Sequence, residues 1–107
     1  MSRRISVADD FSRFPAGRYR TDGPFPGEIF RQRILAPALK ADTAVVVDLN
    51  RTLGFGSSFL EEAFGGLVRE EGFRVDDLRR RLTIQAVDPS LVSEVWSYIE
   101  AAGRAAA

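Results

Sequence analysis

The sequence predicts an α/β fold in which a small β-sheet carries helices mainly on one of its faces. Three observations lead to this prediction: a β-branched run, TAVVVDL, at residues 43–49; stretches of apolar residues at helical spacing on either side of it; and an order in which strands alternate with helices. A chain of 107 residues fits one domain, because a division would leave pieces too small to bury a core. We therefore expect residues 1–107 to form a single domain.

The N-terminal quarter predicts a strand and an irregular segment. In RISVA, residues 4–8, Ile5 and Val7 alternate with their neighbours, which is the pattern of a short strand. Residues 9–27 are rich in glycine, proline and charge, with aromatic residues at irregular spacing. They predict a structured loop or a short hairpin held by those aromatics, in which GRYRT, residues 17–21, is a candidate for a brief second strand.

A first helix is predicted from Gly27. Its apolar residues recur at helical spacing, and Glu28 lies in the first turn, where the helix dipole favours an acidic side chain. Pro37 lacks the amide hydrogen that an interior helical position donates, so we expect this helix to kink or to end near Ala36. The run at residues 43–49 has no alternation, which predicts a central strand buried on both faces.

A second, amphipathic helix is predicted at residues 58–71, with its apolar stripe on the sheet. Gly65 and Gly66 fall inside it, and each costs roughly 1 kcal/mol relative to alanine. These glycines are either tolerated or allow a close approach to a strand or to a partner's backbone, and the sequence does not separate the two explanations. Gly72 supplies the stop of the helix.

The C-terminal third predicts one more strand and one more helix. Residues 73–81, FRVDDLRRR, are expected to form a connection. LTIQAV, residues 82–87, alternates as a strand with one more polar face does. Asp88 and Pro89 suit the N-cap and the first position of a third helix. Residues 100–107 have no apolar anchor larger than alanine, and we expect this tail to fray.

Composition excludes several classes of function. Fifteen basic and fifteen acidic residues balance, so no long-range field steers the chain to nucleic acid or to an anionic membrane. The absence of cysteine and histidine excludes disulfides, Ser-His and Cys-His catalysis and histidine-ligated zinc. We therefore expect no enzymatic activity, no cofactor and no metal. The sequence predicts neither a secretory signal nor a membrane span, and the lack of cysteine fits a reducing cytoplasm.

Two basic clusters are the main candidates for a nucleic-acid interface. They are RQR at residues 31–33 and RRR at residues 79–81. With a net charge of zero and no aromatic strand motif, we expect both clusters to be solvated faces or contacts to an acidic partner. A phosphate cradle is also disfavoured, because no G-K-[ST] follows the glycines of GFGSS.

The segment GFGSSFLEE, residues 54–62, marks the entry to the second helix. Ser58 and Glu61 form the S-x-x-E pattern of a capping box, which is the simplest interpretation of this serine. The free amides and the positive dipole end of a helix start would also partly accommodate a phosphate. A phosphate on Ser58 would remove the cap and face Glu61 and Glu62, so it would act as a switch. Arg51, in the same loop, either offsets that repulsion or is solvated.

These residues carry a resemblance. VVVDLNRTLGFGSSFLEEAFGGLVREEG, residues 45–72, resembles the strand, loop and helix of STAS-like domains, the class that includes bacterial anti-sigma factor antagonists. It most closely resembles a small uncharacterised STAS-like family, DUF4325, whose members carry SSF-L-[DE]-E-F-G after a strand that ends in DL. RYRTDGPFPGEIFRQRIL and LTIQAVDPSLVSEVWSYI are also similar to that family. The resemblance implies a small STAS-like α/β fold with a mixed β-sheet.

The resemblance also implies a candidate site. In the antagonists the corresponding motif is D-S-S-G-L, and a partner kinase of the GHKL ATPase type phosphorylates its second serine. Ser57 and Ser58 align with the two serines and Leu60 with the leucine, whereas Gly56 and Phe59 replace the aspartate and the glycine. The resemblance therefore nominates Ser58 as the phosphoacceptor, with Ser57 as its neighbour or substitute, and a histidine-kinase-like (GHKL) ATPase or anti-sigma-like kinase as the partner.

The expected partner-binding surface is the loop before the second helix together with the first turn of that helix, in which an exposed phenylalanine would be the anchor. Its residues are Leu53, Gly54, Phe55, Gly56, Phe59 and Glu62. We expect a non-enzymatic regulatory domain that binds its partner when unmodified and releases it when phosphorylated. The alternative is a domain that binds a small anionic ligand or a nucleotide through the amides of the same loop. The sequence leaves the oligomeric state open.

Overall fold

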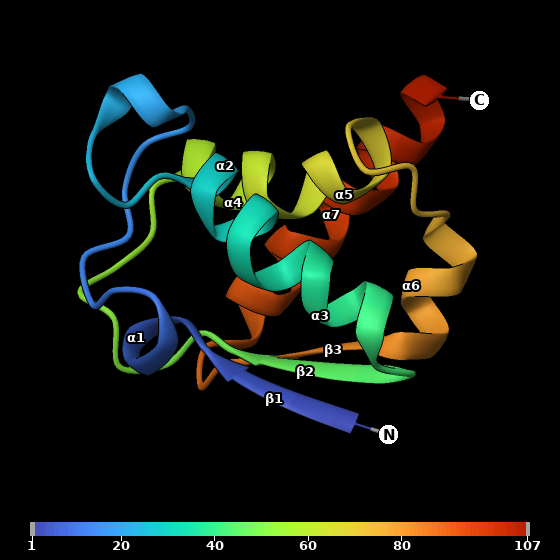
Figure 1. The fold of residues 1–107 in the computed structure, drawn as a ribbon, viewed down its shortest axis with the longest axis horizontal. Helices are drawn as coiled ribbons and strands as arrows, with labels where there is room; N and C mark the ends of the chain where they lie inside the picture. The colour runs from blue at the N-terminus through green and yellow to red at the C-terminus, as the bar shows by residue number, and fades with distance from the viewer. Residues whose placement is uncertain (1, 107) are drawn as a thin grey trace.

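The computed structural model describes residues 2–106, which form two layers (Figure 1). Three strands, β1 (Ser2–Ser6), β2 (Ala44–Asp48) and β3 (Leu82–Gln85), make one sheet in the order β1-β2-β3. The α/β prediction is confirmed, with one difference: both strand pairs are parallel, where the resemblance implied a mixed sheet. Each connection passes through helices, and such a crossover returns the next strand in the same direction.

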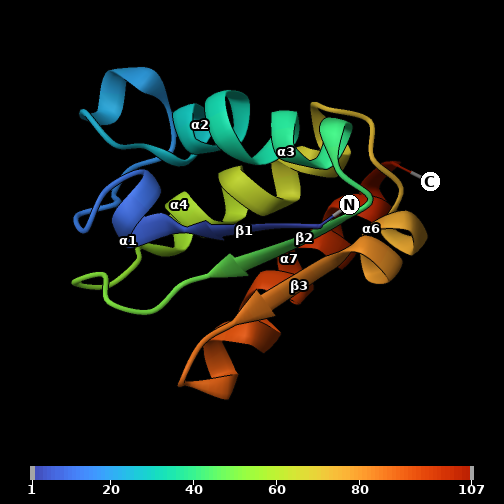
Figure 2. The same ribbon diagram turned by 60° about the horizontal axis from the view of Figure 1, so that its bottom comes forward.

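The sheet is covered by helices on one face only. Ile5, Val47 and Ile84 lie side by side in the strand register and are buried in the core. Val46, on the opposite face, is only half-buried, and its neighbour Thr83 is exposed. Figures 1 and 2 show the helices on the other side of the sheet. The strand at residues 43–49 is therefore confirmed, but its predicted burial on both faces is wrong, because the second layer covers a single face.

The first strand begins and ends two residues earlier than predicted, because a helix follows Ser6 at once. Helix α1 (Val7–Asp10) starts at Ser6, whose hydroxyl accepts a hydrogen bond from the amide of Asp9 at 3.1 Å. The carboxylate of Asp10 accepts one from the amide of Ser6 at 2.8 Å, so the two residues cap each other. This reciprocal cap ends the strand at Ser6 and turns Val7 into the helix.

The segment between α1 and the next helix is held down by aromatic contacts, as predicted. The Phe11 ring lies 5.6 Å from that of Phe25 and 5.4 Å from that of Phe30 in the core. The predicted second strand is wrong: a single turn of 3₁₀ helix, η1 (Arg20–Asp22), stands there. The carboxylate of Asp22 accepts hydrogen bonds from the amides of Arg18 and Tyr19, which closes the turn.

The first long helix does not end at its proline. It continues through α2 (Gly27–Phe30), a wider π turn, η2 (Arg31–Leu35), and α3 (Ala36–Ala41). The amide of Ala36 reaches back five residues to the carbonyl of Arg31, as in a π turn. This π turn directly precedes Pro37, which has no amide hydrogen to donate, and the helix continues past the proline. The predicted end near Ala36 is therefore wrong, and a π turn stands where a kink was predicted.

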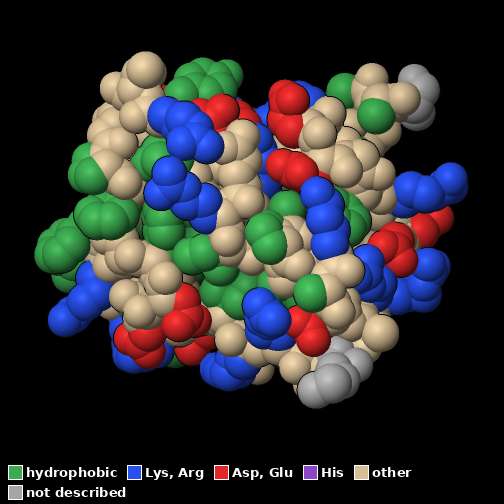
Figure 3. Space-filling view, viewed as in Figure 1, with side chains coloured by type: hydrophobic (Ala, Val, Ile, Leu, Met, Phe, Trp, Pro, Cys, Tyr) green, Lys and Arg blue, Asp and Glu red, His purple; other side chains and the backbone are tan. Residues whose placement is uncertain are grey.

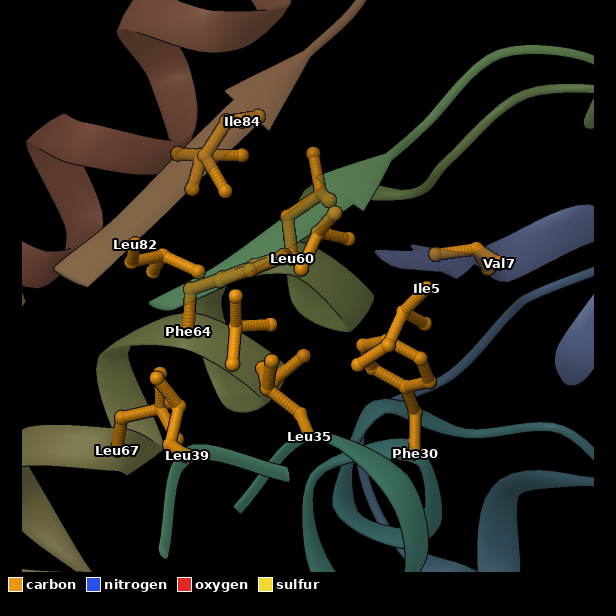
Figure 4. Close-up of a cluster of buried hydrophobic side chains, with 14 of the residues drawn as sticks. Ile5, Val7, Phe30, Leu35, Leu39, Leu60, Phe64, Leu67, Leu82 and Ile84 are labelled. Carbon is orange, nitrogen blue, oxygen red and sulfur yellow. The ribbon is translucent and has the colours of Figure 1, made fainter. Parts of the chain in front are cut away.

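The second long helix has the same construction. It runs through α4 (Ser57–Leu60), a π turn, η3 (Glu61–Gly65), and α5 (Gly66–Arg69). Its apolar stripe is buried on the sheet and on the first long helix, as Figure 4 shows for Leu60, Phe64 and Leu67. The two long helices touch at Gly27, where a Cβ would lie only 2.4 Å from the carbonyl oxygen of Phe59. A glycine at this crossing brings the two backbones together.

The C-terminal part differs from the prediction at two places. Helix α6 (Val75–Arg81) occupies what the sequence indicated as a connection. Helix α7 (Pro89–Ala106) begins at the predicted proline and, where a frayed tail was expected, is helical through Ala106, with Ala102 buried; residue 107 lies outside the described residues. None of the helices in the part of the chain that the structure describes has the length and hydropathy needed to cross a membrane.

Candidate functional site

The carboxyl ends of all three strands meet at one edge of the sheet, which we name the carboxyl edge. The register places Ser6, Asp48 and Gln85 next to one another at this edge. Three connections leave from it: residues 7–26 after β1, residues 49–56 after β2 and residues 86–88 after β3. Loops at this end of a parallel sheet are the usual place for recognition in α/β folds.

The three connections are tied to one another by hydrogen bonds. The carboxylate of Asp48 accepts from the amide of Asn50 at 2.8 Å, which turns the chain at the end of β2. The side-chain oxygen of Asn50 accepts from the amide of Val87 at 2.8 Å. The amide of Leu53 donates to the carbonyl of Arg13 at 2.9 Å. The loop that carries the predicted site is therefore linked to the loops on both sides.

Arg51 is paired at the surface. Its backbone has a φ of 70°, in the left-handed region that residues other than glycine rarely adopt. Its guanidinium lies 2.7 Å from the carboxylate of Asp9 and donates to the hydroxyl of Ser6 at 3.0 Å. The hydrogen bond from Arg51 lowers the pKa of Asp9, and the same bond raises the pKa of Arg51. The position of the guanidinium beside β1 is thus fixed by Asp9 and Ser6.

Ser57 and Ser58 are the first two residues of α4. The capping box predicted for Ser58 and Glu61 is wrong. The N-cap position is Gly56, which has no side chain to cap with. Ser58 lies inside the helix, where the amide of Glu61 is already bound to backbone carbonyls of the first turn. Ser57 is exposed and Ser58 half-buried. Neither hydroxyl has a hydrogen-bond partner among residues 2–106.

The glutamate of the expected capping box binds arginines instead. The carboxylate of Glu61 contacts Arg18 and lies 2.9 Å from Arg69. Burial of Glu61 opposes its ionisation, but the hydrogen bonds from Arg69 and Arg18 outweigh burial and lower its pKa. Arg18 belongs to the connection after β1, so this contact joins that connection to the helix of the serines.

The predicted partner-binding surface is only partly a surface. Leu53, Gly54 and Gly56 are exposed, and Phe55 is half-buried. Phe59 and Glu62 are corrections: both are buried, at 0% and 3% exposure. Phe59 lies on the inner side of α4, with its ring 5.6 Å from that of Phe55 and 6.0 Å from that of Phe30. It anchors the helix to the core and is not available to a partner.

Glu62 belongs to a group of charged residues that sequence reasoning missed, which we name the buried charge network. At its centre Arg31, only 2% exposed, donates from Nη1 to the carboxylate of Glu62 at 2.6 Å and to the carbonyl of Glu62 at 2.7 Å. Its Nε donates to Glu71 at 3.1 Å. The expectation that residues 31–33 form a solvated cluster is therefore wrong for Arg31, because Glu62 of the other long helix and Glu71, just after the end of that helix, compensate its charge.

The glycines of the second long helix make room for this network. A Cβ at Gly66 would lie 2.1 Å from Nη1 of Arg31, and a Cβ at Gly65 would lie 2.6 Å from the carboxylate of Glu61. Each glycine therefore has a close neighbour, but this neighbour is a charged side chain and not the strand or the partner's backbone that the sequence suggested.

Exposed apolar side chains gather at the carboxyl edge. Among residues 2–106, the large apolar side chains that are exposed all lie on its three connections: Phe14 at 63%, Tyr19 at 51%, Phe25 at 37%, Leu53 at 72% and Val87 at 88%. Figure 3 shows hydrophobic side chains along the left side, over the connections after β1 and β2. Sequence reasoning found only the second of these connections, because the aromatics of the first were interpreted as core anchors.

A hollow of about 410 Å³ lies between the connections after β2 and β3. Its apolar walls come from both connections and from the start of α7, and they are Leu49, Phe55, Ala86, Val87 and Leu91. Its charged residues are Arg51, already paired with Asp9, and Asp88, whose carboxyl pKa is lowered by the hydrogen bond from Ser90. The described residues contain no cluster of His, Cys, Asp and Glu able to hold a metal ion.

A family model confirms the resemblance seen in the sequence. The model that matches residues 26–91, more than half of the chain, describes a STAS-like domain of unknown function (DUF4325). The chain belongs to this family. No curated protein and no solved structure matches this STAS-like domain significantly. The matched residues of the STAS-like domain include both long helices, β2, β3 and the loop with the two serines.

Proposed function

We propose that this STAS-like domain is a cytoplasmic regulatory domain that acts by binding another protein at the carboxyl edge. The observation that carries the proposal is the gathering there of the exposed large apolar side chains on three linked connections. Several large apolar side chains left exposed at one end of a domain of this size mark an interaction site, since their burial on association is favourable. The partner we propose, from the resemblance to anti-sigma factor antagonists, is a GHKL-type ATPase.

The proposed regulation is phosphorylation at the start of α4. Exposure favours Ser57, while the alignment with the antagonist motif favours Ser58. A phosphate on either serine adds nearly two negative charges about one helical turn from Glu61. It would repel that carboxylate and compete with it for Arg18, which comes from the connection after β1. Modification would therefore alter the charge and the shape of the surface together.

The first test is affinity purification of the tagged protein from its native cells. Mass spectrometry would identify bound proteins and would search for phosphate on the peptide of residues 54–62. We expect a GHKL-type ATPase in the unmodified fraction and its absence from the phosphorylated fraction. If the ATPase is recovered and the peptide is unmodified in all conditions, the proposed interaction is supported and the proposed phosphorylation switch is contradicted.

A direct titration with the purified ATPase tests the surface. Val87→Glu places a charge on the most exposed apolar side chain of the carboxyl edge, and we expect it to weaken binding by at least about tenfold. The matched control is Ala101→Glu, an exposed position on α7 away from that edge. Equal binding by the Val87→Glu variant and the wild-type chain would contradict the proposed surface.

The rival function, binding of a small anion or nucleotide by the amides of residues 54–58, has less support. The adjacent hollow has mainly apolar walls, and its arginine is already paired with Asp9. A thermal-shift experiment with nucleotides and inorganic phosphate separates the two functions, since a ligand that binds the folded state raises the melting temperature with its occupancy. No shift at any concentration would leave protein binding as the function to pursue.

A further inference from the structure

A second surface lies away from the carboxyl edge, between α6 and the C-terminal half of α7 (Figure 1). Two hollows of about 520 Å³ and 440 Å³ adjoin there and share Val75 and Gly103. Helix α6 ends immediately before the first residue of β3, so this groove faces the amino ends of the strands. A partner at the carboxyl edge would leave it free.

The floor of the groove is apolar. Val68, Phe73 and Val75 are half-buried, and each contributes to the wall of the larger hollow. Gly103 lies opposite them on α7, where a Cβ would come within 2.5 Å of Cγ2 of Val75. Only a glycine lets the two helices pack this closely, and it leaves the valley between them without a side chain of its own.

The rim of the groove carries free positive charge. Arg74 and Arg104 are exposed, and the guanidinium of neither has an ion-pair or hydrogen-bond partner among residues 2–106. Arg79, on the same rim, is engaged: it pairs with Glu100, and its guanidinium lies 5.9 Å from the centroid of the Trp96 ring. The remaining acidic group is Asp76, in the first turn of α6, where the helix dipole offsets its charge.

We propose that this groove docks an acidic amphipathic helix of a partner protein. A valley between two helices accepts the ridge of a third, whose apolar side chains, about one turn apart, would fill the two hollows. Carboxylates beside that apolar stripe would pair with Arg74 and Arg104, which now lack partners. Gly103 and Arg104 lie beyond the residues that the family model matches, and the proposal does not depend on the function proposed for the carboxyl edge.

The experiment uses the full chain and two labelled helical peptides. One peptide carries leucines on a single stripe flanked by glutamates; in the other, lysines replace the glutamates. Binding is followed by fluorescence anisotropy of the label and by the emission of Trp96, the one tryptophan of the chain, which lies beside the groove. We expect the glutamate peptide to bind and to change the tryptophan emission, and the lysine peptide to do neither.

A pair of charge-reversal variants identifies the surface. In R74E/R104E we expect binding of the glutamate peptide to weaken by at least about tenfold. The control is R13E/R33E, the same change of charge at two exposed arginines that have no ion-pair partner in the described chain and lie outside the groove. It should bind within about twofold of the wild-type chain. Because all four positions are exposed, both variants should fold, which circular dichroism verifies.

Three results would overturn the proposal. The first is no binding of the glutamate peptide by the wild-type chain. The second is equal binding of the lysine peptide, which would point to apolar contact without charge recognition. The third is an equal loss in the two double variants, which would reflect the net charge of the molecule and not the groove.

Discussion

The buried charge network and the carboxyl edge reverse the usual distribution of polar and apolar groups. Between the two long helices the chain buries Arg31 at 2% exposure together with Glu62 at 3%, whereas at the carboxyl edge it leaves Val87 at 88% and Leu53 at 72% exposed. Each arrangement is costly by itself, because buried ions lose hydration and exposed apolar groups gain nothing from folding. We infer that the first region stabilises the fold, whereas the second is the surface proposed for partner binding.

Removal of Arg31, the centre of the buried charge network, should have the largest effect on stability. Arg31→Met leaves the buried Glu62 only its longer contacts with Arg18 at 3.3 Å and Arg69 at 3.4 Å, and we expect the free energy of unfolding to fall by up to about 3–5 kcal/mol. Urea denaturation followed by circular dichroism measures the loss. Arg33→Met, an exposed neighbour on the same helix, should change stability by less than about 0.5 kcal/mol. Adding Glu62→Met to the first variant should recover part of the loss, and no recovery would show that charge compensation is not the cause.

The buried charge network needs the space that Gly66 leaves beside Arg31. Gly66→Ala places a Cβ 2.1 Å from Nη1 of Arg31, and the forced shift should cost about 1–3 kcal/mol of the free energy of unfolding. Urea denaturation in a double-mutant cycle tests the cause. In an Arg31→Ala background the same glycine change should cost clearly less. A cost that is equal in the two backgrounds would attribute it to the helix backbone.

Tyr98 lies at the margin of the network and gives a pH-dependent prediction. Its hydroxyl donates to Glu94 at 2.6 Å, and this hydrogen bond, helped by burial and by the charge of Glu94, raises the tyrosine pKa to about 12. The folded state therefore holds this proton more tightly than the unfolded state. The contribution to stability is complete below a pH of about 10 and is lost as the pH rises toward 12.

An ultraviolet titration of tyrosinate measures this effect directly. The chain has two tyrosines, and the phase near pH 12 should disappear in Tyr98→Phe and move to lower pH in Glu94→Gln. The Tyr98→Phe variant should also lose less stability than the wild-type chain between pH 10 and 12. An unchanged titration in Glu94→Gln would contradict the assignment to this hydrogen bond.

The smallest effect is expected at the carboxyl edge. Leu53→Ser should change the free energy of unfolding by less than about 0.5 kcal/mol, since the side chain it replaces is 72% exposed. The same denaturation curves measure this value. A loss comparable to that of Arg31→Met would show that Leu53 supports the fold, and the contrast between the two regions would then disappear.

Local patterns predicted most of the framework. The strand at residues 43–49 and the alternation of residues 82–87 are recognisable because burial follows the period of each element. Helix α6 was missed because its seven residues, VDDLRRR, hold only two apolar positions and no full amphipathic stripe. The π turns were missed as well, since one wider turn barely changes the spacing of the apolar residues.

The site was less predictable than the fold. The sequence correctly placed Ser57 and Ser58 at the entry to the second long helix. The predicted capping box and the predicted exposure of Phe59 were both wrong for the same reason: the helix begins directly after Gly56, one residue earlier than the pattern suggested. That shift places Ser58 inside the helix and turns Phe59 to the core. Burial of Arg31 depends on Glu62 and Glu71, 31 and 40 positions away, and no local pattern contains contacts of that range.

The hydrogen bonds between the connections have a consequence for binding kinetics. Leu53 is bound to the backbone of Arg13, and Val87 to the side chain of Asn50, so the exposed apolar groups sit on a preorganised platform. A partner would not need to order separate loops, and the conformational entropy lost on association would be correspondingly small. Association would then resemble the docking of rigid surfaces. Differences in affinity between variants would arise mainly from the rate of dissociation.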